Sequence, residues 1–181
     1  MQLSFSEHVL QLRRWDNRAE MEHYLENSAE RYVLLGENDR EEHFHSIMVY
    51  YSGMMSPAWG IGVISMDLAV LPTLLLHPPD TLVLGNNQEA VALNVSSQRE
   101  VFRFEFDTPF RAFIHLPEHE LLLIFNEIGV VAVRLNGHQL WKYEKDVITN
   151  YSVDDGKLRL SFMDSPGVVL DLLDGPIPQG C

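Results

Sequence analysis

Apolar and polar residues alternate along much of the chain, and the alternation is clearest in the second half. Phe102, Phe104 and Phe106 fall at every second position with smaller or charged residues between them, and the same spacing recurs over residues 158–162. Side chains two positions apart point to the same face of a strand. Because stacked sheets bury such faces against each other, we expect these aromatic residues to form core rather than a ligand platform.

The first half predicts one helix followed by further strands. Asp16 and Asn17 offer capping oxygens before residues 18–27, where Met21, Tyr24 and Leu25 are spaced as on one helical face. The pattern then changes to short runs of β-branched and aromatic residues separated by Gly, Pro, Asn and Asp. These runs cover residues 31–35, 45–51 and 59–65.

An internal repeat occupies residues 81–175. Residues 129–137 (GVVAVRLNG) recur as residues 167–175 (GVVLDLLDG), 38 positions later and identical at five of nine positions. A period near 40 residues built from short strands is typical of propeller-type repeats, each a four-stranded antiparallel unit. The expected strands of the first unit are 81–87, 89–95, 99–106 and 110–116. Those of the second are 120–127, 129–136, 138–144 and 147–154, and a half unit follows at 157–164 and 167–174.

Residues 92–102 (ALNVSSQREVF) resemble the tryptophan-docking motif of pyrroloquinoline-quinone-type (PQQ-like) β-propeller repeats, in which Ala, Asp, Thr-Gly-Lys and Trp occur at fixed spacing. Ala92 keeps its place, Asn94 stands for Asp, residues 97–99 stand for Thr-Gly-Lys, and Phe102 stands for Trp. A second copy, residues 132–141, is one residue shorter and keeps the tryptophan as Trp141. The resemblance covers about half of the chain and implies a local blade-like fold. It carries over no cofactor residues, and we expect no cofactor.

The predicted architecture is mainly β: an antiparallel meander of blade-like four-stranded repeats, an open or partial propeller, with a short N-terminal helix. Closing a propeller takes at least four blades, so either residues 40–80 add a further blade or the sheet stays open, which we favour. We expect a single domain over residues 1–181, with the helix and first strands in 1–80, the repeat in 81–175 and a tail in 176–181. Open edges at residues 81–84 and 167–173 predict a homodimer, or else cover by the helix at 18–27.

Charge narrows the range of partners. Lys and Arg number 13 and Asp and Glu 26, which gives a formal net charge of −13 at pH 7. Nucleic-acid affinity comes chiefly from Lys and Arg that displace counterions, so neither nucleic acid nor an anionic membrane is expected as a partner. The first residues lack the apolar stretch of a secretory signal, and the one cysteine, Cys181, permits no internal disulfide. These features predict a cytoplasmic protein.

The sequence shows no catalytic constellation, so we expect no enzyme. It contains no Gly-x-Ser-x-Gly elbow, no Gly-x-Gly-x-x-Gly loop and no phosphate loop. His43 and His45 share one face of a predicted strand and could hold a metal in two-ligand geometry. The acid that follows such a pair in cupin barrels is missing here. His115 and His119, around a predicted turn at Pro117, are further metal candidates.

Two functional hypotheses remain. The first is a non-catalytic protein-interaction module, in its sharper form an acidic inhibitor or immunity-type protein that covers a basic partner and associates rapidly through charge. The alternative is a metal-binding or small-molecule-binding protein that uses the four histidines. Residues 54–59 (MMSPAW) join two predicted strands and either pack in the core, which we favour, or expose an apolar patch suited to a partner.

Overall fold

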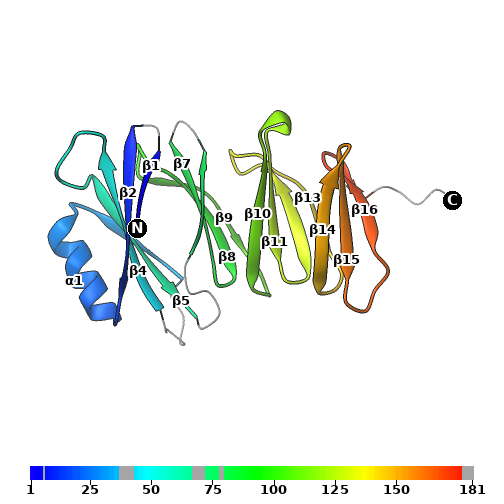
Figure 1. Ribbon diagram of the computed structural model, residues 1–181, viewed down its shortest axis with the longest axis horizontal. Helices are drawn as coiled ribbons and strands as arrows, with labels where there is room; N and C mark the ends of the chain where they lie inside the picture. Colours follow the sequence, from blue (N-terminus) through cyan, green and yellow to red (C-terminus); the bar gives the residue numbers. More distant parts are fainter. Residues whose placement is uncertain (6, 37–42, 67–71, 78–79, 177–181) are drawn as a thin grey trace. The chain divides into compact units, whose positions relative to one another are not determined.

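The structure, a computed structural model, describes residues 1–5, 7–36, 43–66, 72–77 and 80–176. The chain forms two compact units, Met1–Phe104 and Glu105–Cys181, called unit 1 and unit 2 below. Both units are built mainly from antiparallel strands (Figure 1), which confirms the predicted fold class. The units divide at residue 104, whereas the sequence predicts a change near residue 80 within one domain.

Sheet A, in unit 1, has five strands in the order β1-β2-β4-β5-β3. They are β1 (Gln2–Phe5), β2 (His8–Trp15), β3 (Tyr32–Leu35), β4 (His43–Tyr51) and β5 (Trp59–Ser65). Neighbouring strands are antiparallel, except that β3 runs parallel to β5. The three runs predicted after the helix are therefore strands of one mixed sheet. Residues 43–65 do not form a further four-stranded blade.

The N-terminal helix is confirmed as α1 (Arg18–Ser28). Asn17 caps it, because its side-chain Oδ1 accepts a hydrogen bond of 2.9 Å from the backbone N–H of Glu20. Asp16, the other candidate cap, precedes the capping residue. Met21 and Leu25 point inward and are fully buried, as their helical spacing predicts.

Helix α1 lies on one face of sheet A and contacts β5, β4 and β2 (Figure 1). Two glycines of β5 permit this close approach. A Cβ on Gly60 would lie 2.6 Å from Leu25 Cδ2, and one on Gly62 would lie 3.1 Å from Leu25 Cδ1. The helix thus covers a sheet face, and the expectation that it lies across an open sheet edge is wrong.

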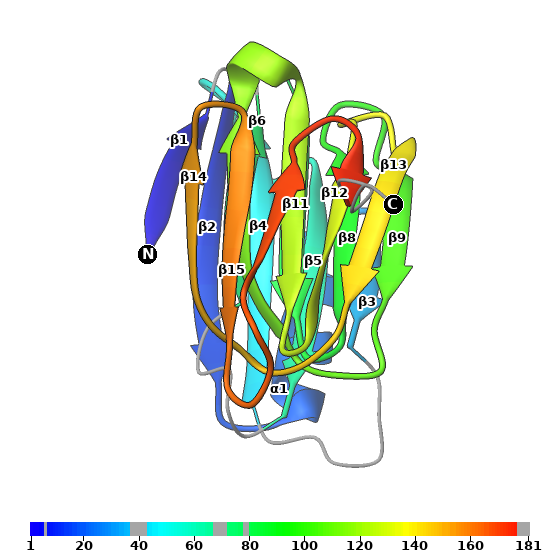
Figure 2. The same ribbon diagram turned by 90° about the vertical axis from the view of Figure 1, so that its right-hand side faces the viewer.

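Three four-stranded antiparallel sheets follow in chain order, sheets B, C and D. Sheet B contains β6 (Thr73–His77), β7 (Thr81–Asn86), β8 (Glu89–Asn94) and β9 (Arg99–Glu105). Sheet C contains β10 (Phe110–Leu116), β11 (Leu121–Asn126), β12 (Gly129–Val133) and β13 (Gln139–Glu144). Sheet D contains β14 (Ile148–Asp154), β15 (Lys157–Phe162), β16 (Val168–Asp171) and β17 (Gly175–Pro176). Figure 2 shows β14 and β15 side by side.

The predicted strands are present, but the predicted grouping into blades is wrong by one strand. Each sheet begins one strand earlier than expected, because β6 was not predicted and supplies the first strand of sheet B. The predicted half unit is instead completed by β14 and by β17. As a result β7 and β16, whose residues were expected to form open edges, are each hydrogen-bonded to neighbours on both sides.

Each unit has its own apolar core. In unit 1 the face of sheet A opposite α1 packs against sheet B, and the shared cluster includes Ile47, Val63, Leu84 and Val91. In unit 2 sheet C packs against sheet D through a second cluster that includes Phe125 and Leu160. The prediction that the alternating apolar residues form core is confirmed for residues 158, 160 and 162, which belong to the second cluster. Phe102 and Phe106 are buried as well, whereas Phe104 is only half-buried.

Trp141 joins the two sheets of unit 2. Its indole Nε1 donates a hydrogen bond of 3.0 Å to the backbone oxygen of Leu172. The ring lies against Gly175, where an added Cβ would approach Trp141 Cγ to 2.6 Å. Gly175 has φ +77°, a conformation that favours glycine. A side chain of β13 thus fixes the turn that leads into β17.

Candidate interaction surface

The hairpin between β4 and β5 presents two methionines to solvent. The backbone N–H of Ala58 donates to Val49 O (2.7 Å) and that of Met54 donates to Tyr51 O (3.0 Å), which closes the hairpin. Gly53 adopts φ +83° and turns the chain before the methionines. Met54 is 63% exposed and Met55 98% exposed, whereas Trp59 at the other end is 1% exposed.

This result decides between the two interpretations of residues 54–59. Core packing, which the sequence favoured, holds for Trp59 and fails for the two methionines. The sequence signal was present, because Gly53 before the methionines and Pro57 after them mark a turn. We predicted that the methionines are buried because they are hydrophobic. Solvent-exposed apolar side chains are common, however, and only their clustering is informative.

The base of the hairpin is held by neighbouring segments of unit 1. The backbone N–H of Ser52 donates to Glu7 O (2.6 Å), in the connection between β1 and β2. The Tyr51 ring lies 5.1 Å from the His8 ring, and its hydroxyl lies 3.5 Å from Ser96 O in the turn after β8. The methionines therefore project from a fixed base.

We call this end of unit 1 the methionine end, defined as residues 7–8, 51–58 and 95–98. These three segments contain Glu7 and no Lys or Arg. Glu7 is exposed. The methionine end therefore combines exposed apolar side chains with negative charge.

A shallow groove of about 310 Å³ adjoins the hairpin. Its lining residues are Gln2, Val9, Gln11, Tyr50, Tyr51, Gly53 and Met54. The lining is uncharged, and it is ordered in part by a hydrogen bond of 3.0 Å from the Tyr50 hydroxyl to Gln11 Oε1. Burial, together with the adjacent Tyr24, raises the pKa of Tyr50. The phenol therefore stays neutral at physiological pH, and with its hydroxyl hydrogen donated to Gln11 it adds no charge to the groove.

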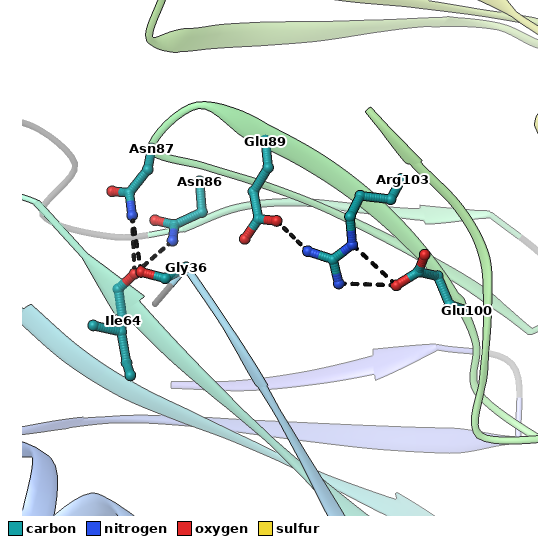
Figure 3. A network of polar contacts seen from close by, with 7 residues as sticks. All are labelled: Gly36, Ile64, Asn86, Asn87, Glu89, Glu100 and Arg103. Carbon is teal, nitrogen blue, oxygen red and sulfur yellow. Dashed lines mark hydrogen bonds and ion pairs between the residues drawn. The ribbon is translucent and has the colours of Figure 1, made fainter. Parts of the chain in front are cut away.

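A polar network lies between sheets A and B (Figure 3). Asn86 Nδ2 and Asn87 Nδ2 donate to Ile64 O at 2.8 and 3.1 Å, and Asn87 Nδ2 also contacts Gly36 O at 3.4 Å. A Cβ on Gly36 would approach Ile64 O to 2.1 Å, so only glycine fits there. These contacts tie β7 to the ends of β3 and β5, and their role is structural.

Arg103 continues the polar network within sheet B (Figure 3). Its guanidinium forms ion pairs with Glu89 and, at 2.8 Å, with Glu100. The carboxylate of Glu89 is therefore committed to a partner within the sheet.

The four candidate histidines are divided between the two units. His43 and His45 occupy alternate positions of β4 as predicted, but His45 is fully buried while His43 lies near the surface beside Arg14, with Arg14 Nη2 3.3 Å from His43 Nδ1. His115 and His119 belong to unit 2, in β10 and in the short 3-10 helix Pro117–His119. Among the described residues, no three His, Cys, Asp or Glu side chains are grouped to hold a metal ion.

Unit 2 holds a second shallow groove of about 300 Å³, lined by Arg111, Ala112, Phe125, Asn126, Ile148 and Tyr151. The rings of Phe125 and Tyr151 stack at 4.4 Å, and Arg111 forms an ion pair with Glu127 at 2.7 Å. The charge of Arg111 is thus balanced locally. Cys181, the single cysteine of the chain, lies outside the described residues.

Comparisons with known proteins show distant structural likeness only. No protein-family model matches the chain, and no curated protein matches it. A structure of KlHsv2 with loop 6CD replaced by a Gly-Ser linker matches with a TM-score of 0.45 and 10% identity, over 74% of this chain and 46% of that one. Hsv2 from Kluyvelomyces marxianus matches with a TM-score of 0.40 and 10% identity, over 75% and 48%. This chain thus corresponds to less than half the length of either structure.

Membrane crossing by a helix is not supported for the part of the chain that the structure describes, where no helix is both long and apolar enough.

Proposed function

We propose that this chain is a non-catalytic protein-interaction module that binds a basic partner through the methionine end. The observation that carries the proposal is the pair of exposed methionines, Met54 and Met55, on a hairpin whose base is hydrogen-bonded to a neighbouring connection. Adjacent exposed apolar side chains on a fixed support are a feature of binding surfaces.

Burial of the two methionine side chains in a complex would provide enough free energy for them to act as binding anchors. Burying one such side chain stabilises a complex by about 1.5–3 kcal/mol. Methionine is unbranched and polarisable, so it adapts to irregular apolar pockets. The fixed base limits the conformational entropy lost on binding, because the hairpin is already ordered in the free protein.

Charge specifies the partner further. The chain has a net charge of −13, and the methionine end contributes Glu7 without any compensating Lys or Arg. A partner with Lys and Arg around an apolar pocket would be attracted at long range and then hold the methionines. An inhibitor or immunity-type protein that covers a basic protein fits this description.

The test compares two matched variants. Tagged protein is expressed in the native cell, and co-purifying proteins are identified for the wild type, for Met54→Gln/Met55→Gln and for Met163→Gln. Met163 is 62% exposed and lies in unit 2, so it controls for a general loss of surface methionine. We expect a basic protein to be captured by the wild type and by Met163→Gln, and to be lost from the double variant.

Salt provides the second readout. If electrostatic attraction steers the association, raising the ionic strength should lower the association rate constant by a larger factor than it changes the dissociation rate constant. Equal capture by all three proteins, or a captured partner of acidic composition, would contradict the proposal.

A further inference from the structure

The seven methionines of the chain fall into sharply different environments. Met21 and Met48, which lie between α1 and sheet A, are 0% and 1% exposed. Met54 and Met55 form an adjacent exposed pair, whereas Met1 and Met163 are exposed singly, at 65% and 62%. Met66 is half-buried, and its backbone N–H donates to Asn87 Oδ1 at 2.8 Å.

We propose that Met54 and Met55 form a reversible oxidation site, at which a hydroperoxide converts the thioethers of the methionine end to sulfoxides while the fold persists. Susceptibility of a methionine to oxidation rises with its exposure. The buried methionines are protected, because a peroxide reaches them only when the structure opens locally or globally.

The chemistry balances with the hydroperoxide as the only co-reactant. A sulfur lone pair attacks one peroxide oxygen, the O–O bond breaks and an S–O bond forms. The departing hydroxide or alkoxide takes the proton of the transferred hydroxyl and leaves as water or an alcohol. Sulfur loses two electrons and the peroxide gains them. A sulfoxide reductase reverses the change with two electrons from a dithiol, which becomes a disulfide while the sulfoxide oxygen leaves as water.

Two structural features confine the effect to the surface. Met54 and Met55 are exposed, and neither belongs to the two core clusters that the described residues of unit 1 form. The hydrogen bonds that close and hold the hairpin are backbone bonds at Ser52, Met54 and Ala58, which a sulfoxide leaves intact. Oxidation therefore changes the polarity of the methionine end without removing its support.

The consequence for binding rests on the proposed function. A sulfoxide is polar and chiral, and it disrupts apolar interfaces built from methionine. Two sulfoxides side by side would replace the anchor with groups that keep their hydration. The oxidised protein should thus bind its partner more weakly than the reduced protein.

The first experiment needs no partner. The purified full chain is treated with graded hydrogen peroxide, and sulfoxide at each methionine is followed by peptide mass spectrometry alongside thermal unfolding. We expect Met55 to react first, and Met21 and Met48 to react at least about tenfold more slowly because their reaction requires opening of the structure. The melting temperature should stay unchanged until Met21 or Met48 reacts.

Equal oxidation rates at Met55 and Met48 would overturn the proposal, as would a melting temperature that falls in step with oxidation of Met54 and Met55. Met1→Leu/Met163→Leu protein repeats the measurement with the singly exposed methionines removed. Treatment with methionine sulfoxide reductase should restore both thioethers.

The second experiment separates this inference from the proposed function. Met54→Leu/Met55→Leu keeps the apolar character and cannot form sulfoxides, so its capture of the partner should be insensitive to peroxide, whereas capture by the wild type should fall. Unchanged capture by fully oxidised wild type would overturn the link between oxidation and binding. Unchanged capture by Met54→Gln/Met55→Gln would instead refute the proposed function and leave the oxidation rates as measured.

Discussion

Trp141 shows how a single side chain can connect two sheets. Its ring contributes apolar area to the core of unit 2, its indole N–H is paired with Leu172 O, and its face excludes any side chain at Gly175. The repeat in the sequence pointed to this residue through the resemblance of residues 132–141 to a docking motif. Leu172 and Gly175 lie 31 and 34 positions later in the chain, so their role as its contacts required the structure.

Replacing Trp141 tests this connection. Trp141→Ala should lower the free energy of unfolding by about 3–5 kcal/mol, the range for large buried aromatic side chains. Trp141→Phe keeps most of the ring and loses the hydrogen bond, which is worth about 1 kcal/mol, so it should cost less than Trp141→Ala. Denaturant unfolding measures both, and an unchanged midpoint for Trp141→Ala would contradict the role of the repeat.

Asp171 gives unit 2 a defined acid sensitivity. Lys157 Nζ donates to its carboxylate at 2.9 Å, and the backbone N–H groups of Leu173 and Asp174 donate as well. These bonds, the one from Lys157 first, lower the pKa of Asp171 from 3.8 to about 2. A depressed pKa in the folded state stabilises the fold above the unfolded pKa, and the contribution is lost as the pH falls through the folded value.

The expected outcome is a loss of stability between pH 3.8 and about pH 2. Asp171→Asn removes the titrating group, so the variant should be less stable than the wild type at neutral pH and should lose less stability on acidification. Urea unfolding at several pH values measures the difference. Parallel pH profiles for the two proteins would show that Asp171 makes no such contribution.

The two histidines of β4 lead to a prediction about the metal content of the protein. His45 is fully buried on the sheet face that packs against sheet B, and His43 lies beside a guanidinium that competes electrostatically with a cation. We expect no stoichiometric zinc, nickel or iron in protein purified under native conditions. Elemental analysis that finds about one metal per chain, lost in His43→Ala/His45→Ala, would favour the metal-binding alternative.

At the scale of elements, the sequence predicted what periodicity and capping determine locally. The cap at Asn17 and the spacing of Met21 and Leu25 located α1 within one residue. The strand β6 was missed because its apolar run is three consecutive leucines, which lack the alternation that marks a half-buried strand, even though prolines at positions 72 and 78 bound the run. The predicted blade boundaries were therefore displaced by one strand. A repeat of 38 residues gives the length of a blade but not the strand at which the blade begins.

The candidate surface was harder to predict than the strands. Periodicity assigns a side chain to a face of an element, but residues 54–58 lie between elements and have no periodicity. Their exposure depends on Gly53 and on contacts to Glu7 and Ser96, which are distant in the sequence. The acidic character of the protein, by contrast, could be predicted from its composition. The methionine end, which contains no Lys or Arg, has the same acidic character.

The contact of α1 with sheet A depends on glycine in β5. A Cβ on Gly62 would lie 2.5 Å from Leu34 Cδ2 and 3.2 Å from Met21 Cε. Gly62→Ala should therefore destabilise the protein by about 1–3 kcal/mol, the usual cost of overpacking a core. Thermal or urea unfolding measures this change.

A double-mutant cycle identifies the cause. Leu34→Ala removes the atom nearest to the added methyl group, so Gly62→Ala should cost less in the Leu34→Ala background than in the wild type. Equal costs in both backgrounds would assign the effect to backbone conformation instead.

At the scale of the whole molecule, each of the four described sheets has two edge strands. Each sheet is an open order of strands, so its first and last strands are hydrogen-bonded on one side within the sheet. Edge strand β6 consists of Thr, three Leu and His, and carries none of the Lys or Pro that guard exposed edges. Because α1 contacts a face of sheet A, it does not cover this edge of sheet B.

A homodimer therefore remains our expectation. One isologous contact between two copies would cover the same edge twice. Sedimentation equilibrium at about micromolar concentration, well above the dissociation constants typical of stable interfaces, should give twice the chain mass of 20.8 kDa. A mass equal to one chain would leave a monomer with exposed edges.

The alternation along β15 gives sheet D an apolar face toward sheet C and a polar face on its other side. Leu158, Leu160 and Phe162 are buried toward sheet C, while Arg159 and Ser161 are exposed on the opposite face. Stacked repeats need a terminal member with a polar outer face, because an apolar one would recruit another layer. The outer face of sheet D is thus polar at these positions, and Arg159 and Ser161 disfavour the packing of a further apolar layer against it.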